Sequence, residues 1–77
     1  MSFWVAWRNT KQRAQDERFA ELRQQLAQAV SVEDVEAVVV TVPGLRSMRA
    51  ISPTHVREVM TAAEQRIEAI WAAEGRA

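Results

Sequence analysis

The hydrophobic residues of the C-terminal third recur at alternating four- and three-residue steps, which is the spacing of one face of an α-helix. We call this set the C-terminal seam, and its members are Val56, Met60, Ala63, Ile67 and Ile70. A similar set in the first half, the N-terminal seam, consists of Phe19, Leu22, Leu26 and Ala29. Both patterns predict helices with one apolar face, and the two faces can pack together within one chain or between two chains.

The N-terminal seam belongs to a helix predicted for residues 10–30. Asn9 and Gln12 have the spacing of a capping box, which places the start of this helix near residue 10. Residues 11–18 are polar apart from Ala14, so the apolar face is confined to the second half of the helix. We therefore expect its first turns to project beyond the core or to face a partner.

A second, shorter helix is predicted for residues 32–41. Ser31 followed by Asp34 has the spacing of a helix N-terminus. The run of β-branched residues that ends at Val42 also favours a strand over residues 37–42. We prefer the helix, because a single strand has no partner in this chain and would need to pair across a dimer.

The third predicted helix covers residues 53–74. Pro43-Gly44 indicates a type II turn that closes the preceding element, with the glycine at positive φ. Ser52 suits the N-cap, and Pro53 suits the first helical position. Gly75 follows the last apolar position, where glycine commonly ends a helix in the left-handed conformation.

These elements predict an all-α protein, either a small three-helix bundle or a helical hairpin with a short middle helix. The 77 residues suffice for one domain, which we place at residues 9–77, after an aromatic segment at residues 1–8. A chain of this length buries a small core, and it contains no cysteine for disulfides or thiolate metal sites. We therefore expect the bundle to be completed by oligomerisation or by a bound partner.

The N-terminal segment holds three of the five aromatic residues of the chain, outside both seams: Phe3, Trp4 and Trp7. Aromatic side chains carry large apolar areas, so we expect these three to be covered. They can fold back over the end of the bundle near Trp71, or they can anchor a protein partner, since Trp is enriched among the residues that dominate interface energies. Contact with a membrane surface is a third interpretation, but residues 11–18 lack the apolar face that it requires.

The same segment is too short for the core of a signal peptide, and its charged residues follow it instead of preceding it. No stretch approaches the roughly 20 apolar residues of a membrane-spanning helix. We therefore expect a cytoplasmic protein without a membrane span.

His55 is the only histidine and therefore the only candidate for an imidazole general base. Its neighbour Ser52 is already explained as a helix cap, and a helix N-terminus disfavours a charged imidazole. His55 and Glu58 share a helix face, but metal sites in helical bundles draw further carboxylates and a second histidine from facing helices. The chain also lacks a glycine-rich phosphate loop. We expect no catalytic residue, no metal site and no cofactor.

The charges of the chain are grouped, although ten Lys and Arg residues balance ten Asp and Glu residues. All charged residues within 31–43 are acidic, and all charged residues within 44–57 are basic. The zero net charge argues against a large nucleic-acid footprint but leaves room for a local one. The candidate phosphate contacts in this local patch are Arg46, Arg49, His55 and Arg57.

Part of this basic region resembles the turn and recognition helix of helix-turn-helix DNA-binding domains. The resemblance covers residues 45–60 and has small or apolar residues at the inward positions Ala50, Ile51, Val56 and Val59. Arg46 and Arg49 depart from that pattern, because those positions face inward in such domains. The run Val42-Pro43-Gly44-Leu45 is similar to helix-hairpin-helix modules, but Arg46 replaces their second glycine. Both resemblances imply contact with DNA phosphates.

Taken together, the seams, the isolated aromatic cluster and the lack of catalytic groups predict a small non-enzymatic interaction or adaptor protein. Its partner would be another protein or a second copy of the same chain. The alternative is a nucleic-acid-binding regulator that uses the basic region.

Overall fold

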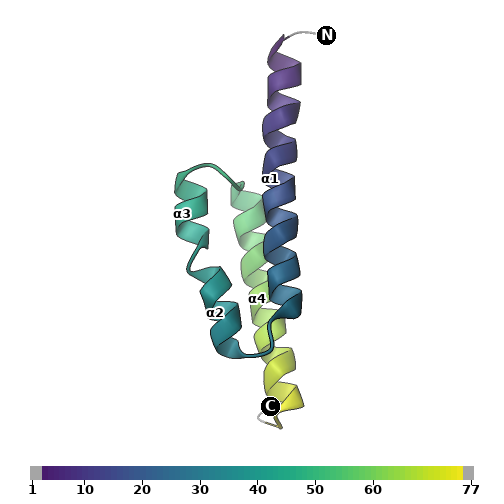
Figure 1. The fold of residues 1–77 in the computed structure, drawn as a ribbon, viewed down its shortest axis with the longest axis vertical. Coiled ribbons are helices and arrows are strands. Elements are labelled where there is room, and N and C mark those ends of the chain that lie inside the picture. The colour runs from purple at the N-terminus through teal and green to yellow at the C-terminus, as the bar shows by residue number, and fades with distance from the viewer. Residues whose placement is uncertain (1–2, 76–77) are drawn as a thin grey trace.

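The computed structural model describes the backbone of residues 3–75 and the side chains of residues 9–75. This part of the chain forms four helices, α1 (Phe3–Gln28), α2 (Val32–Val39), α3 (Val42–Ser47) and α4 (Pro53–Ala73), shown in Figure 1. The described residues contain no strand, so the all-α prediction is confirmed. The molecule is elongated, with extents of 55 × 20 × 16 Å.

The two long helices, α1 and α4, lie side by side, and the two short helices cover one side of the pair (Figure 1). α2 contacts both long helices, whereas the main contact of α3 is with α4. The N-terminal end of α1 and the C-terminal end of α4 extend beyond the packed region at opposite ends of the molecule. α1 and α4 run in the same direction, and the connection formed by α2 and α3 runs in the opposite direction between them (Figure 1). The arrangement is therefore a small helical bundle whose middle segment is divided into two short helices.

The core lies between the long helices and the α2–α3 connection. Its most buried side chains come from three different segments, namely Val35 in α2, Ile51 before α4, and Val59 in α4. Burying a side chain of this size contributes about 1.5–3 kcal/mol. The N-terminal seam contributes to the same core, because Leu22 and Leu26 are buried.

The buried face of α4 overlaps the C-terminal seam but is displaced from it toward Val59. Val59, which the seam omits, is fully buried, whereas the seam residue Met60 is 41% exposed. The seam residues Ala63 and Ile70 are buried, and Val56 and Ile67 lie at the margin of the core. The displacement arises because α4 packs against α1 on one side and against α2 and α3 on another. The centre of its buried face therefore lies between these two contacts.

α1 begins at Phe3 and continues without interruption through Asn9 and Gln12. The predicted start near residue 10 is therefore wrong. Residues 3–8 contain no Gly or Pro, so nothing in this segment breaks a helix. Residues three apart also lie one turn apart inside any helix, so the Asn9–Gln12 spacing does not distinguish a helix start from a helix interior.

The segment from 37 to 42 is not a strand, which agrees with the helical alternative. α2 ends at Val39, and α3 begins at Val42. The type II turn predicted at Pro43-Gly44 is wrong, because both residues lie inside α3 and Gly44 does not have a positive φ. Proline is compatible with the first turn of a helix, where its missing N–H would have no helical acceptor.

The N-termini of α2 and α4 have the predicted caps. The Ser31 hydroxyl accepts a hydrogen bond from the backbone N–H of Asp34 at 3.2 Å. Ser52 caps α4 in the same way, and Pro53 is the first residue of that helix. At the other end, Gly75 has φ of +77° and donates its N–H to the carbonyl of Ala72. The predicted start and end signals of this helix are thus confirmed.

Candidate functional site

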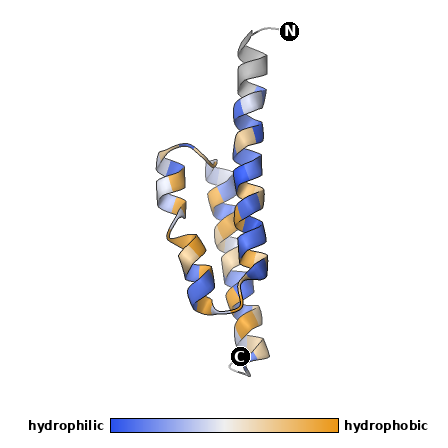
Figure 2. Ribbon diagram, viewed as in Figure 1, coloured by the Kyte–Doolittle hydropathy of each residue, from blue (hydrophilic) through white to orange (hydrophobic). Residues whose placement is uncertain are grey.

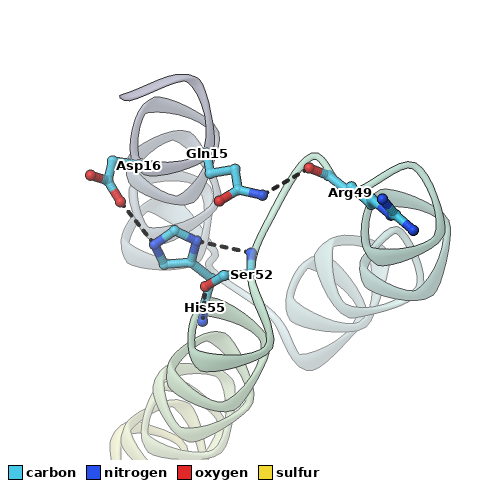
Figure 3. Close-up of polar contacts among 5 residues, drawn as sticks. All are labelled: Gln15, Asp16, Arg49, Ser52 and His55. Carbon is cyan, nitrogen blue, oxygen red and sulfur yellow. Dashed lines mark hydrogen bonds and ion pairs between the residues drawn. The ribbon is translucent and has the colours of Figure 1, made fainter. Parts of the chain in front are cut away.

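His55 connects the start of α4 to the middle of α1 (Figure 3). Its Nε2 lies 3.0 Å from the Asp16 carboxylate on α1. Its Nδ1 accepts a hydrogen bond from the backbone N–H of Ser52 at 3.2 Å, while the Ser52 hydroxyl accepts one from the backbone N–H of His55 at 3.1 Å. Because a backbone N–H can only donate, Nδ1 must be unprotonated in this arrangement, and Nε2 carries the proton toward Asp16.

The surroundings of His55 favour a structural role over a catalytic one. Its ring stacks on Phe19, with 4.6 Å between ring centroids and 14° between planes. The side chain is 12% exposed, whereas that of its partner Asp16 is 60% exposed. The hydroxyl that contacts this residue, that of Ser52, accepts a hydrogen bond from the backbone N–H of His55. The described residues contain no group of three or more side chains that could hold a metal ion.

An open groove of about 710 Å³ lies beside His55, where α1 leaves the packed region. We call it the notch. α1 contributes one wall, and the end of α3 and the start of α4 contribute the other. Its charged lining consists of the cations Lys11, Arg46 and Arg49 and the carboxylate of Asp16.

The notch brings together three of the four residues predicted to contact phosphates, namely Arg46, Arg49 and His55. Arg57 lies elsewhere, beside Phe19 and Arg23 in a separate hollow between α1 and α4. Lys11 joins the notch from a distant part of the chain, and sequence reasoning missed it. No local signal links Lys11 to the basic segment, because only the packing of α1 against α4 brings the two together.

Arg49 ends α3 in an unusual conformation for a residue other than glycine. Its φ is +58°, and it is the only non-glycine residue with positive φ in the described chain. The N–H of Ala50 bonds to the carbonyl of Leu45 at 2.8 Å, and the N–H of Arg49 bonds to the carbonyl of Arg46 at 3.0 Å. This pair of bonds is a Schellman motif, in which glycine normally occupies the left-handed position.

The backbone at Arg49 is also tied to α1. Gln15 donates a hydrogen bond from Nε2 to the Arg49 carbonyl at 3.0 Å (Figure 3). The Arg49 side chain points away from His55 and toward α3 in the same view. The guanidinium groups of Arg46 and Arg49 make no hydrogen bond or ion pair with the described residues, and both side chains are exposed. They are therefore available to an anionic ligand.

The backbone that carries the proposed aromatic anchor, Phe3, Trp4 and Trp7, is helical and belongs to α1, whereas these side chains lie outside the described part of the structure. Residues 9–14, which follow, are all exposed. Figure 2 shows that hydrophilic residues predominate along the described side chains of α1. Trp71, near which the aromatic segment was expected to fold, lies toward the opposite end of the molecule (Figure 1). The fold-back interpretation is therefore wrong for the backbone of α1.

Several apolar side chains remain on the surface of the described chain. Three are largely exposed: Val30 before α2, Val40 after it, and Met48 after α3. Trp71, near the end of α4, is 42% exposed. No helix among the described residues is long and apolar enough to cross a membrane.

Comparisons with protein-family models, with curated protein sequences and with solved structures give no match to this chain.

Proposed function

We propose that the protein is a small, non-enzymatic interaction or adaptor module that binds another protein or a second copy of itself. The observation that carries this proposal is the first helix, which continues as a helix from Phe3 although residues 9–14 are all exposed. We call the first turns of this helix, residues 3–14, the arm, and its residues 9–14 present a surface that the described side chains do not cover.

The sequence of the arm supports a binding role. It carries Phe3, Trp4 and Trp7 within little more than one helical turn, and residues three or four apart share a helix face. Apolar and aromatic residues that share one face of a helix are typical of segments that dock into a groove on a partner. The exposed apolar side chains elsewhere, together with the small core, support completion of the bundle by a partner or by self-association.

The arm can be tested with a triple variant, Phe3→Ala, Trp4→Ala and Trp7→Ala, compared with Val40→Ala/Met48→Ala as a control that removes exposed apolar residues elsewhere. Both proteins should fold, as judged by circular dichroism. We expect specific partners, captured by affinity purification with the intact chain, to be lost with the arm variant and retained with the control. Capture that is equal for all three proteins would contradict the proposal.

A second candidate function is nucleic-acid binding, and the notch is the observation that favours it. The notch gathers Lys11, Arg46 and Arg49 beside His55. A salt titration of duplex DNA binding tests this alternative, because phosphate contacts make the affinity fall steeply with added salt. Absence of binding at low salt would remove it.

A further inference from the structure

The charges of this chain are separated along its long axis, although they sum to zero. The end from which the arm projects carries exposed basic side chains from α1, α3 and the α3 C-terminus: Lys11, Arg13, Arg46 and Arg49. One carboxylate, that of Asp16, lines the notch, and it contacts the imidazole of His55. Two of these cations, Arg46 and Arg49, make no ion pair with the described residues, so their charge is available at this end.

The opposite end of the molecule is acidic. α2 begins there with the exposed residues Glu33, Asp34 and Glu36 (Figure 1). The last turns of α4 add the exposed residues Glu64 and Glu68. Arg66, whose Nε donates to the Ala29 carbonyl at 2.9 Å, is a cation at this end, and these carboxylates outnumber it.

The last turns of α4 also carry an exposed aromatic residue on the acidic face. Glu64, Glu68 and Trp71 follow one another at steps of four and three residues, so they share one face of the helix. Their side chains are all exposed. This face combines two carboxylates with an indole, which is the composition that suits a cationic surface with apolar groups beside it.

We propose that the notch binds the C-terminal turns of α4 from a second copy of this chain. In this arrangement Glu64 and Glu68 of one copy face Arg46 and Arg49 of the other, and Trp71 packs beside the arm. Two elongated copies placed antiparallel bring the basic end of each against the acidic end of the other, so a two-fold dimer satisfies both contacts at once. This inference rests on the proposed interaction function and identifies its partner as a second copy.

A second copy fits the notch better than a nucleic acid does. The notch contains few cations, and the ring of His55 is stacked on Phe19 and 12% exposed, so it offers no free surface for base stacking. The sequence of the arm, whose helix continues past the notch, contains three aromatic residues, which a phosphate backbone does not require. A carboxylate-bearing helix with an exposed indole matches both features.

The experiment is sedimentation equilibrium of the full chain at low ionic strength, where charge pairs are least screened. We expect a mass above that of the 8.7 kDa monomer, which falls as salt is added. The notch variant Arg46→Glu/Arg49→Glu and the tail variant Glu64→Lys/Glu68→Lys should each weaken self-association by about tenfold or more. An equimolar mixture of the two variants should restore it, because each reversed surface then finds its complement.

Three controls separate this contact from other effects. Arg57→Glu reverses one arginine outside the notch, where the notch variant reverses two, and it should leave self-association unchanged. Arg46→Gln/Arg49→Gly removes the notch charges with residues that suit their backbone conformations, so its loss of association cannot be attributed to misfolding. Duplex DNA serves as the third control, because notch-dependent DNA binding without self-association would favour the nucleic-acid alternative.

A monomer at every concentration at low salt would overturn the inference, as would a mixture of reversed variants that fails to associate. Neither result would affect the arm-dependent capture of another protein, so the broader interaction function is tested separately. The converse result is an intact chain that captures no other protein through the arm and still forms an oligomer that dissociates with salt. That result would identify a second copy of the chain as the partner.

Discussion

At the scale of single residues, His55 shows how one side chain joins two helices. Its three contacts serve different purposes: the Ser52 N–H bond completes the cap of α4, the stack on Phe19 buries the ring, and the Asp16 contact reaches α1. None of the three contacts requires a charged imidazole, because the ring accepts a hydrogen bond at Nδ1 and donates one from Nε2. We therefore attribute the contribution of His55 mainly to capping and packing.

His55→Ala should lower the free energy of unfolding by about 1–2 kcal/mol, because it removes the stacked ring and leaves the Ser52 N–H without its acceptor. Asp16→Ala should cost less, about 0.5 kcal/mol, because the carboxylate is largely exposed. Urea denaturation of both variants measures the difference. Thr54→Ala, at an exposed neighbouring position, is the control. An equal loss from Asp16→Ala would show that the contact between His55 and Asp16 dominates instead.

Arg49→Gly should stabilise the fold, by up to about 1 kcal/mol, because glycine adopts the left-handed conformation of the α3 C-terminus without the Cβ penalty. Arg46→Gly, inside α3, should instead destabilise by about 1 kcal/mol. Chemical denaturation curves for the two variants measure whether the free energy of unfolding rises for Arg49→Gly and falls for Arg46→Gly. A destabilised Arg49→Gly would mean that the arginine side chain itself supports the native fold.

At the scale of elements, α4 shows that the buried face of a helix depends on how many neighbours it has. A helix with one neighbour buries a single seam, whereas a helix with neighbours on two sides buries a face that lies between them. Its buried face is centred on Val59 and Ala63, because α1 and the α2–α3 connection contact it from different directions. Met60 lies one residue away from this centre and remains substantially exposed.

Val59→Ala should therefore destabilise the protein by about 2 kcal/mol, through the lost burial and the cavity left in a fully buried position. Met60→Ala, an apolar truncation at the adjacent position, should cost about 0.5 kcal/mol. The two midpoints in urea measure the difference directly. Equal losses would place the packed face of α4 on the seam that the sequence indicates.

The helix ends were more predictable than the packing. Ser31, Ser52 and Gly75 were identified correctly, because a cap depends on hydrogen bonds among residues within one turn of each other. Pro43-Gly44 was misassigned because the same dipeptide fits both a tight turn and the first turn of a helix. Only the surrounding contacts decide between these alternatives.

The candidate site depended still more on tertiary structure. Arg46, Arg49 and His55 were selected from one basic stretch, and they do line one groove. Lys11 and Gln15 were not selected, because their place in the notch follows from the packing of α1 against α4. Arg57 was grouped with the others by proximity in sequence, yet it lies in a different hollow along α4.

At the scale of the whole molecule, α1 divides into two parts with different environments. Residues such as Leu22 and Leu26 are buried against the core, whereas residues 9–14 are exposed. A helical segment without tertiary contacts is only marginally stable in water, because most helical stability in proteins comes from packing of an apolar face. One continuous helix can therefore contain two levels of stability.

Amide hydrogen exchange should reveal this division. We expect the amides of residues 9–14 to exchange at least about tenfold faster than those of residues 22–28 in the same helix, because local opening of the exposed turns leaves the core intact. Exchange measured at low protein concentration reports the free chain. At high concentration and low salt, association through the notch should slow exchange at residues 11–14, while Arg46→Glu/Arg49→Glu should abolish this added protection. Uniform protection along α1 in the dilute free chain would show that the arm is stabilised by contacts within its own chain, and it would then offer no uncovered surface to a partner.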